Sequence, residues 1–408
     1  MLSSAGSSYA SAYMSRKALK HALKYGVASH VTWSQGGYAS HSVPVAVSQP
    51  RASPVEQHQR IQVLQPLPAA SFTAPLSFTA PLCHRRLQGL WPACLVPTLA
   101  DGSVDLPKIL CHINRLLRAG CDGVTLFGTC GEGASFSVAE RRQLLEFVVR
   151  AGVPPSKLLV ATYACALPDA VELTKHATAY GVFGVMFIPP FYFNNPTDDG
   201  VVQATCELIK RVADPRLRIV LYHIPSVTGV AFTEAAVAEI IRRHPQNIIG
   251  LKDSSGDQQH SMRFIKRFPT IGIVIGNELQ IPKLMPEGAS GSVCGAGNIS
   301  PNLVLRIIRN PQNVDATDWA ALNALGGLVW DAGAPFFLGV YAHPTPNKST
   351  VLSYYFDLIT RYKTIMAEQT KDASWLNCRL PQTPMSQADR EVLLKKYKAI
   401  EAQYGHLF

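Results

Sequence analysis

The sequence predicts an α/β fold: a closed (β/α)8 TIM barrel followed by a C-terminal helical extension. Two patterns between residues 87 and 310 lead to this prediction. Short continuous apolar runs, typical of parallel strands buried on both faces, alternate with amphipathic stretches of helical period. Eight such runs fall within roughly 220 residues, which fits a closed barrel better than an open sheet.

The eight expected strands are named here by their sequences. In chain order they read GLWPACLVPT, GVTLFGTCGE, KLLVATYACA, GVFGVMFIPP, LRIVLYHIP, NIIGLKDSS, IGIVIGNE and GSVCGAGN. The helices between them include SVAERRQLLEFVVRAG, in which Ser137 and Glu140 form a capping box, PDAVELTKHATAYG, TEAAVAEIIRRHP and QHSMRFIKRFP.

An open doubly wound sheet is the alternative architecture. Its first strand usually leads into a glycine-rich phosphate loop, whereas the first run here leads into VPTLADGS. After the eighth run, the sequence is mainly helical in pattern. We expect the barrel to span residues 87–310, and residues 311–408 to hold the last barrel helix and the C-terminal helical extension, which Leu380–Pro384 interrupts.

Residues 1–86 differ from the rest of the chain because they are rich in serine and alanine and poor in acids. They contain a tandem SFTAPL repeat, and near the start Arg16, Lys17, Lys20 and Lys24 interleave with apolar residues at helical spacing. This pattern predicts a transit peptide and a location in an organelle matrix or stroma, mitochondrial or plastid. A merely disordered N-terminal tail is the alternative, and it would leave the protein in the cytoplasm.

The net charge of +10 does not predict a nucleic-acid partner. Residues 1–90 carry eight lysines and arginines against one acid, whereas the remaining residues carry thirty against twenty-seven. The body of the protein is therefore nearly neutral, without the basic surface that nucleic acid requires. The most apolar run, GVFGVMFIPPFYF, is short and interrupted by two prolines, so no membrane partner is expected.

The nine cysteines are scattered and form no CxxC pair and no Cys/His cluster with zinc spacing. In a chain of this size, that distribution predicts reduced thiols in a reducing compartment. We expect no bound metal.

Polar residues follow several of the expected strands. Thr129 follows the second strand, Tyr192 the fourth and Tyr222 the fifth, and Lys252 ends the sixth. Each has an ordinary explanation, since lysine often ends a strand and tyrosine often packs there. In a barrel, however, these strand ends meet at one rim, where active sites lie.

These residue types together permit one particular chemistry. A neutral lysine amine attacks the ketone of a 2-oxo acid and forms an iminium, which stabilises a carbanion on the neighbouring carbon. A phenol hydrogen-bonded to a hydroxyl carries the protons that this step moves. No cofactor is needed beyond the covalent lysine imine.

Three motifs, GTCGE, YHIP followed by Thr228-Gly229, and GLKDSSG, resemble in order and spacing the dihydrodipicolinate synthase/N-acetylneuraminate lyase family. These are class I pyruvate-dependent aldolases and lyases on a (β/α)8 barrel. The resemblance covers about Gly89 to Gly297 clearly. It implies a small-molecule 2-oxo acid and an aldehyde as substrates, and a homodimer or homotetramer.

The resemblance also implies roles for individual residues. Lys252 matches the Schiff-base lysine, Tyr222 the proton-carrying tyrosine, and Thr129 the hydroxyl that links it to a second tyrosine, which Tyr192 matches. In many members that second tyrosine reaches in from a neighbouring subunit. Further substrate contacts are expected from Thr129, Cys130, Gly131 and Val293, and a structural role from Glu132.

Two positions depart from the family pattern. Cys130 stands where many members carry a second threonine or serine, and its thiol is a weaker hydrogen-bond donor. Val227 stands where members that make dihydrodipicolinate carry an arginine, and valine cannot bind a carboxylate. The DSSG after Lys252 resembles relatives acting on 2-oxo-3-deoxy sugar acids or hydroxy-oxo acids, so the aldehyde stays open. A catalytically silent barrel that serves as a binding or assembly module is the alternative function.

Overall fold

Parallel strands alternating with helices make up most of the described chain. The computed structural model describes residues 86–329 and 348–408, with side chains in the last part from Leu358 onward. All of these residues belong to one compact unit of the chain, Thr79–Phe408. The predictions of a transit peptide and of a disordered segment fall on residues outside the described ranges.

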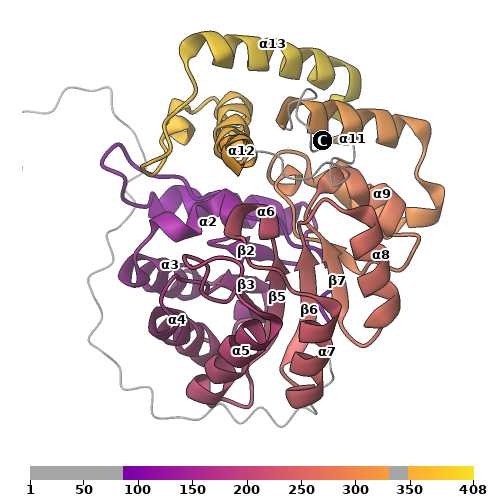
Figure 1. Ribbon diagram of the computed structural model, residues 1–408. Helices are drawn as coiled ribbons and strands as arrows, with labels where there is room; N and C mark the ends of the chain where they lie inside the picture. The colour runs from indigo at the N-terminus through magenta and orange to yellow at the C-terminus, as the bar shows by residue number, and fades with distance from the viewer. Residues whose placement is uncertain (1–85, 330–347) are drawn as a thin grey trace, which may run out of the picture. The chain divides into compact units, whose positions relative to one another are not determined.

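Eight strands, all parallel, form one sheet within the described residues (Figure 1). They are β1 (Gly89–Leu90), β2 (Val124–Leu126), β3 (Leu158–Ala161), β4 (Gly184–Phe187), β5 (Ile219–His223), β6 (Ile248–Asp253), β7 (Gly272–Ile275) and β8 (Gly291–Ser292). The order along the sheet is β1-β8-β7-β6-β5-β4-β3-β2. A parallel bridge between Ala93 and Thr125 joins the two ends, so the sheet closes into the predicted barrel.

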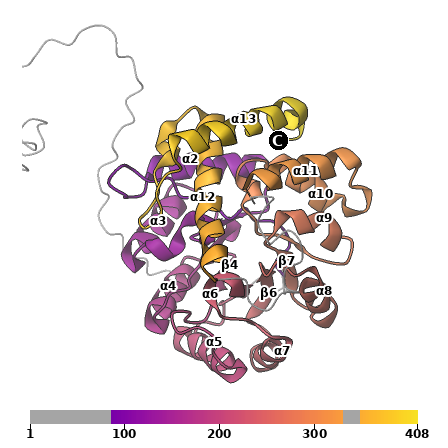
Figure 2. The same cartoon turned by 45° about the horizontal axis from the view of Figure 1, so that its top comes forward.

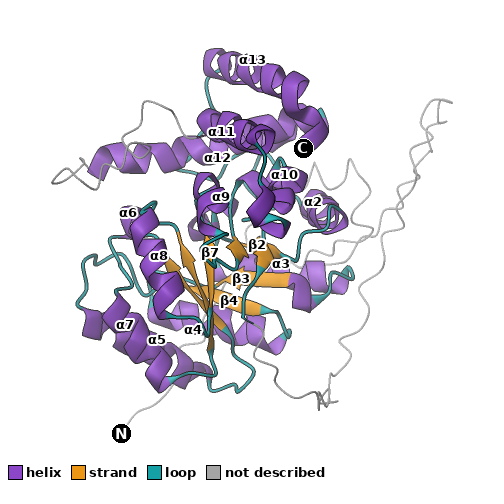
Figure 3. Ribbon diagram, turned by 90° about the vertical axis from the view of Figure 1, so that its right-hand side faces the viewer, coloured by secondary structure: helices purple, strands orange, loops and turns teal. Residues whose placement is uncertain are grey.

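The helices lie outside the barrel strands and over one end of the barrel (Figure 3). Those that follow the strands are α2 (Leu106–Arg118), α3 (Val138–Arg150), α4 (Leu167–Ala179), α5 (Asp198–Val212), α6 (Pro225–Thr228), α7 (Glu234–Arg243), α8 (Gln258–Arg267), α9 (Ile281–Leu284) and α10 (Pro301–Arg309). The C-terminal helices are α11 (Ala316–Val329), α12 (Lys348–Thr370) and α13 (Gln387–Tyr404).

The strand and helix boundaries follow from local chemistry that the sequence shows. Every residue of β3, β4, β6 and β7 is buried, as expected for apolar runs covered on both faces. The predicted capping box at the start of α3 is present: the Ser137 hydroxyl accepts from the Glu140 N–H, and the Glu140 carboxylate accepts from the Ser137 N–H. Such a cap stabilises a helix by about 1 kcal/mol.

The C-terminal helix α12 crosses the carboxyl end of the barrel (Figure 2). It contacts α6 and two short 3-10 helices that follow strands, η1 (Thr129–Gly131) and η5 (Ala296–Asn298). Helices α11 and α13 pack against α12 and against each other. This extension therefore forms part of the wall at the end of the barrel where active sites lie. None of the described helices combines the length and hydropathy that a membrane span requires.

Candidate active site

Lys252 projects into the barrel near the carboxyl end of β6. Its side chain is 3 % exposed, although the next three residues begin a polar turn. In the parallel pairing of β5 with β6, Lys252 is the register partner of Tyr222, so the two side chains point to the same side. The Nζ atom lies 4.1 Å from the centre of the Tyr222 ring.

The surroundings of Lys252 favour the neutral amine. Burial lowers its pKa from the ordinary value to about 8, because the ammonium form loses its hydration inside the barrel. Cys130, Cys294 and Glu278 partly offset this effect and raise the pKa. A lysine with this pKa has a substantial neutral fraction near pH 8, which a nucleophilic amine requires.

Thr129 and Tyr222 form the hydroxyl pair that the motifs predict. The Thr129 Oγ1 and Tyr222 Oη atoms lie 2.9 Å apart. Burial raises the pKa of Tyr222, while side-chain hydrogen bonds with Thr129 and Ser254 lower it. The phenol is thus protonated at neutral pH and held by neighbouring hydroxyls next to the lysine amine.

The GTCGE turn that carries Thr129 has an unusual backbone. Phe127, just before it, and Glu132, its last residue, adopt left-handed conformations with φ of 57° and 52°. A Cβ atom on Gly133 would lie 1.9 Å from the Phe127 carbonyl oxygen, so only glycine fits there. Strained residues of this kind cluster at functional sites, because the surrounding structure must hold them in place.

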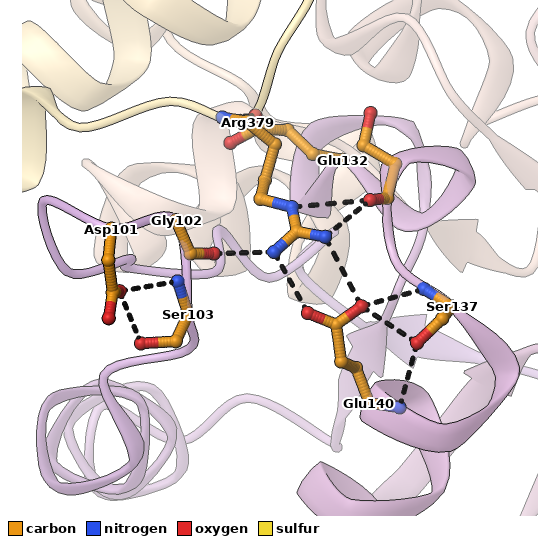
Figure 4. A network of polar contacts seen from close by, with 8 residues as sticks. Asp101, Gly102, Ser103, Glu132, Ser137, Glu140 and Arg379 are labelled. Carbon is orange, nitrogen blue, oxygen red and sulfur yellow. Dashed lines mark hydrogen bonds and ion pairs between the residues drawn. The ribbon is translucent and has the colours of Figure 1, made fainter. Parts of the chain in front are cut away.

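Glu132 anchors this turn to the C-terminal extension. Its carboxylate forms a fully buried ion pair with Lys363 of α12 and accepts a 2.7 Å hydrogen bond from the backbone N–H of Arg379. The Arg379 guanidinium in turn bonds Glu140, at the start of α3, and the Gly102 and Ser135 carbonyls (Figure 4). These contacts support the structural role expected for Glu132.

A small cavity with a volume of about 30 Å³ opens in front of Lys252. Thr129, Cys130, Tyr222, Lys252, Ser254 and Val293 line it, together with Ala93, Ile224, Gly256, Gly276, Asn277, Glu278, Cys294, Gly295, Leu358 and Tyr362. The free space suits a molecule of a few heavy atoms.

The structure brings most of the predicted site residues together. Gly131 is buried in the turn next to the cavity, where a Cβ atom would lie 2.6 Å from the Cys94 carbonyl oxygen. Tyr192 is not at the cavity of its own chain. It is 74 % exposed on the loop after β4 and packs edge-on against Phe193.

Glu278 and Tyr362 are among the cavity residues that sequence reasoning missed. Glu278 follows β7 and is 1 % exposed, and the Tyr362 hydroxyl donates a 2.7 Å hydrogen bond to its carboxylate. The acid in IGNE at the end of the seventh expected strand was the available signal for Glu278. Nothing in the sequence places Tyr362, because it reaches the cavity from α12.

A second polar cluster lies behind β5 and β6, and sequence reasoning missed it as well. His223 and Asp253, whose side chains point away from the barrel axis, meet His260 of α8. Asp253 accepts a 2.8 Å hydrogen bond from His260 and one of 2.7 Å from Ser261. Burial alone would raise the pKa of Asp253, but the hydrogen bond and the neighbouring histidines lower it to about 2.

This cluster is a hydrogen-bonded network rather than a built metal site. The two imidazole rings are stacked, with centroids 4.4 Å apart and an interplanar angle of 9°. Ring-nitrogen lone pairs lie in the ring planes, so parallel stacked rings do not aim them at one ion. In addition, Nδ1 of His223 accepts the Phe232 N–H at 3.0 Å. The cluster holds the ends of β5 and β6 together directly behind Tyr222 and Lys252.

Comparison with known proteins identifies the family of this chain. Residues 86–325 match the model of the dihydrodipicolinate synthetase family. An uncharacterized DapA-like lyase of Chloroflexus aurantiacus is 34 % identical over 220 residues, 53 % of this chain and 72 % of the relative. The N-acetylneuraminate lyase of Rattus norvegicus is 30 % identical over 220 residues, 51 % of this chain and 66 % of the relative.

The fold has solved counterparts as well. A crystal structure of dihydrodipicolinate synthase from Agrobacterium tumefaciens matches 77 % of this chain and 99 % of its own, with a TM-score of 0.66 and 27 % identity. The family model covers more than half of the chain, including every strand of the barrel. The chain therefore belongs to the dihydrodipicolinate synthetase family and is a lyase of that family.

Proposed function

We propose that this protein forms a Schiff base between Lys252 and pyruvate or a closely similar 2-oxo acid, and then makes or breaks a carbon–carbon bond to an aldehyde. The observation that carries the proposal is the buried Lys252 amine, of lowered pKa, 4.1 Å from the ring of Tyr222 in a small cavity. Membership of the family and the matching motifs support it.

The 2-oxo acid would bind with its carboxylate at the GTCGE turn. The first N–H groups of a helical turn have no partner within it, and those of Thr129 and Cys130 begin η1. Burial raises the pKa of the Cys130 thiol to about 11, so it stays neutral and does not repel an anion. Val293 would form an apolar wall of the same cavity.

The reaction would then proceed by ordinary imine chemistry. The neutral Lys252 amine attacks C2, and Tyr222 passes a proton to the oxygen, which leaves as water. Loss of a C3 proton gives an enamine, whose C3 attacks the aldehyde carbon. Cleavage is the reverse of these steps. No cofactor or metal takes part in this scheme.

Borohydride trapping tests the proposal. Incubation of the full chain with pyruvate and borohydride is expected to attach a reduced pyruvate adduct at Lys252, located by peptide mass spectrometry. Lys252→Arg should abolish the adduct, whereas Lys266→Arg, at an exposed position of α8, should leave it unchanged. Folded protein without an adduct at Lys252 would refute the proposal.

A panel of aldehydes and 2-oxo acid adducts, assayed for pyruvate consumption or release, distinguishes the enzyme from the silent barrel. The silent barrel predicts no turnover of any of them.

A further inference from the structure

Helix α12 contributes two side chains to the candidate cavity, and the family motifs assign no role to either. Leu358 and Tyr362 lie one turn apart, so they share a face of α12, and both line the cavity in front of Lys252. Tyr362 is fully buried and Leu358 is 3 % exposed. The C-terminal extension therefore closes one side of the space in which the proposed reaction takes place.

The Tyr362 ring is held firmly in this wall. Its hydroxyl donates a 2.7 Å hydrogen bond to Glu278, and its ring packs so closely on the backbone of Gly295 that a Cβ atom there would collide with it. Burial raises the pKa of Tyr362, so the phenol stays protonated and keeps its hydrogen bond. The next residue, Lys363, forms the buried ion pair with Glu132. Helix α12 cannot shift at this point without breaking these contacts.

The free space lies on one side of Lys252. In the closed order of the sheet, β2 and β6 are opposite each other, with β3 to β5 between them on one side and β1, β8 and β7 on the other. The described residues that line the cavity lie in or after β1, β2, β5, β6, β7 and β8, but not β3 or β4. A 2-oxo acid with its carboxylate at the GTCGE turn and its C2 at Lys252 would therefore extend from C3 towards β7, β8 and the Tyr362 ring.

We propose that Tyr362 is a specificity-determining residue whose ring limits how far the substrate extends beyond C3, so that the protein takes short aldehydes of two or three carbons. The inference rests on the proposed Schiff-base function and narrows its substrate. The cavity has a volume of only about 30 Å³, and a longer aldehyde would have to displace a ring packed on the barrel backbone. A clash of this kind discriminates between substrates that share the same reacting groups.

A series of unbranched 2-oxo acids tests this limit. Pyruvate, 2-oxobutanoate, 2-oxopentanoate and 2-oxohexanoate form the same imine, and their extra carbons occupy the place of the aldehyde carbons in the aldol adduct. The rate of borohydride trapping on Lys252 at low acid concentration gives a trapping efficiency for each acid. The decisive quantity is the ratio of the efficiency for 2-oxohexanoate to that for pyruvate, measured in the full chain and its variants.

Four variants separate ring size from other effects. Tyr362→Ala removes the ring, and Tyr362→Phe keeps the ring but removes the hydroxyl. Leu358→Ala widens the same wall and leaves the hydrogen bond to Glu278 in place. Tyr397→Ala, on α13, is the matched control, because Tyr397 is also fully buried and its hydroxyl is hydrogen-bonded, but it does not line the cavity.

In the wild-type chain, we expect the trapping efficiency to fall by about tenfold or more from pyruvate to 2-oxohexanoate, because the longer chain overfills a packed wall. Tyr362→Ala should raise the ratio by about tenfold or more, and Leu358→Ala should raise it in the same direction. Tyr362→Phe and Tyr397→Ala should keep the wild-type ratio.

Several results would overturn the inference. The first is a Tyr362→Ala protein that folds and forms the pyruvate adduct but keeps the wild-type ratio. The second is an equal gain from Tyr362→Phe or from Tyr397→Ala, since the hydrogen bond or general loosening would then explain it. If Tyr362→Ala does not fold, Leu358→Ala decides, and an unchanged ratio in that variant refutes the limit.

The complete reaction gives a second readout. Pyruvate consumption is measured with glycolaldehyde, of two carbons, and with erythrose, of four, and each variant is compared with the wild-type chain on the same aldehyde. Tyr362→Ala is expected to gain on erythrose relative to glycolaldehyde. Wild-type protein that uses erythrose as efficiently as glycolaldehyde would contradict the inference.

The same measurements distinguish this inference from the function on which it rests. If the wild-type chain forms the pyruvate adduct and traps 2-oxohexanoate equally well, the Schiff-base function stands and the role of Tyr362 is refuted. If the wild-type chain forms no adduct with pyruvate, the proposed function fails and the inference fails with it.

Discussion

Lys252 and Tyr222 are register partners on neighbouring parallel strands, and the lysine Nζ lies 4.1 Å from the centre of the tyrosine ring. The pairing holds the lysine amine over the face of the tyrosine ring, which attracts the ammonium form. It also places the tyrosine hydroxyl near the neutral amine, where it can transfer protons. A change of register by one residue would turn one of the two side chains out of the barrel.

The pH dependence of imine formation should report the pKa of Lys252. Below the lowered pKa of about 8 the amine is mostly protonated, so the trapping rate is expected to rise about tenfold per pH unit and to level off above pH 8. The measurement is the initial rate of borohydride trapping at pH values from 6 to 10. A rate that still rises steeply above pH 9 would mean an ordinary, solvated lysine.

Removal of the Lys252 charge should stabilise the fold while it abolishes the adduct. Because the pKa of Lys252 is lower in the folded chain than in the unfolded chain, its buried charge destabilises the folded state below about pH 8. Lys252→Met is expected to raise the free energy of unfolding at pH 7 by up to about 3 kcal/mol.

The gain in free energy of unfolding from Lys252→Met should shrink as pH rises from 8 to 10, because Lys252 of the folded wild-type chain is then mostly uncharged. Urea denaturation at pH 7 and pH 10 checks this difference. If Lys252→Met were less stable than the wild-type chain at pH 7, the destabilisation assigned to the buried charge of Lys252 would be wrong.

Loss of the hydroxyls next to Lys252 should slow the proton transfers. Tyr222→Phe is expected to lower the maximal rate of imine formation by about 10²- to 10⁴-fold, the usual contribution of a positioned acid or base. Thr129→Val, which removes only the 2.9 Å partner of that phenol, should cost less. Single-turnover trapping measures both, and equal rates in all three proteins would exclude a role for this pair.

The uncharged side chain of Val227 should restrict which aldehydes the protein accepts as substrates. It lies on α6, and the neighbouring Ile224 lines the cavity. Val227→Arg is expected to raise kcat/KM for aldehydes that carry a carboxylate by about tenfold, through a charge-assisted hydrogen bond. Val227→Met fills similar space without charge and should give no gain. A gain from both variants would point to shape rather than charge.

The buried ion pair between Lys363 and Glu132 should be costly to break. Both side chains are fully buried, so Lys363→Met leaves an unpaired carboxylate and is expected to cost about 3–5 kcal/mol of stability. Lys398→Met, which removes an exposed ion pair with Glu368, should cost less than about 1 kcal/mol. Thermal and urea unfolding measure the stability of the two variants. If both lose less than about 1 kcal/mol, the large contribution assigned to the buried ion pair is wrong.

The barrel could be predicted because each strand is a local signal. Continuous apolar runs such as the one that ends at Lys252 are read from neighbouring residues alone, and so is the capping box at Ser137 and Glu140. Thr129, Tyr222 and Lys252 were found by one rule, that polar residues at strand ends share a rim. The family resemblance added Cys130 and Val293.

The missed residues depend on longer-range geometry. Glu278 obeys the strand-end rule, but an acid after a strand is common enough to pass without notice. Tyr362 reaches the cavity from a helix 84 residues after its partner Glu278. His260 meets Asp253 only because α8 folds back over β6. Such contacts are set by tertiary packing, which local patterns do not encode.

The position of Lys363 in the chain bears on the order in which the protein matures. Glu132 lies near the start of the barrel, and its two anchors follow 231 and 247 residues later. During translation the Glu132 carboxylate therefore has neither of these partners until nearly the whole polypeptide has been synthesised. A nascent chain stalled before Lys363 would contain the sequences of all eight strands and still lack the partner that holds this turn.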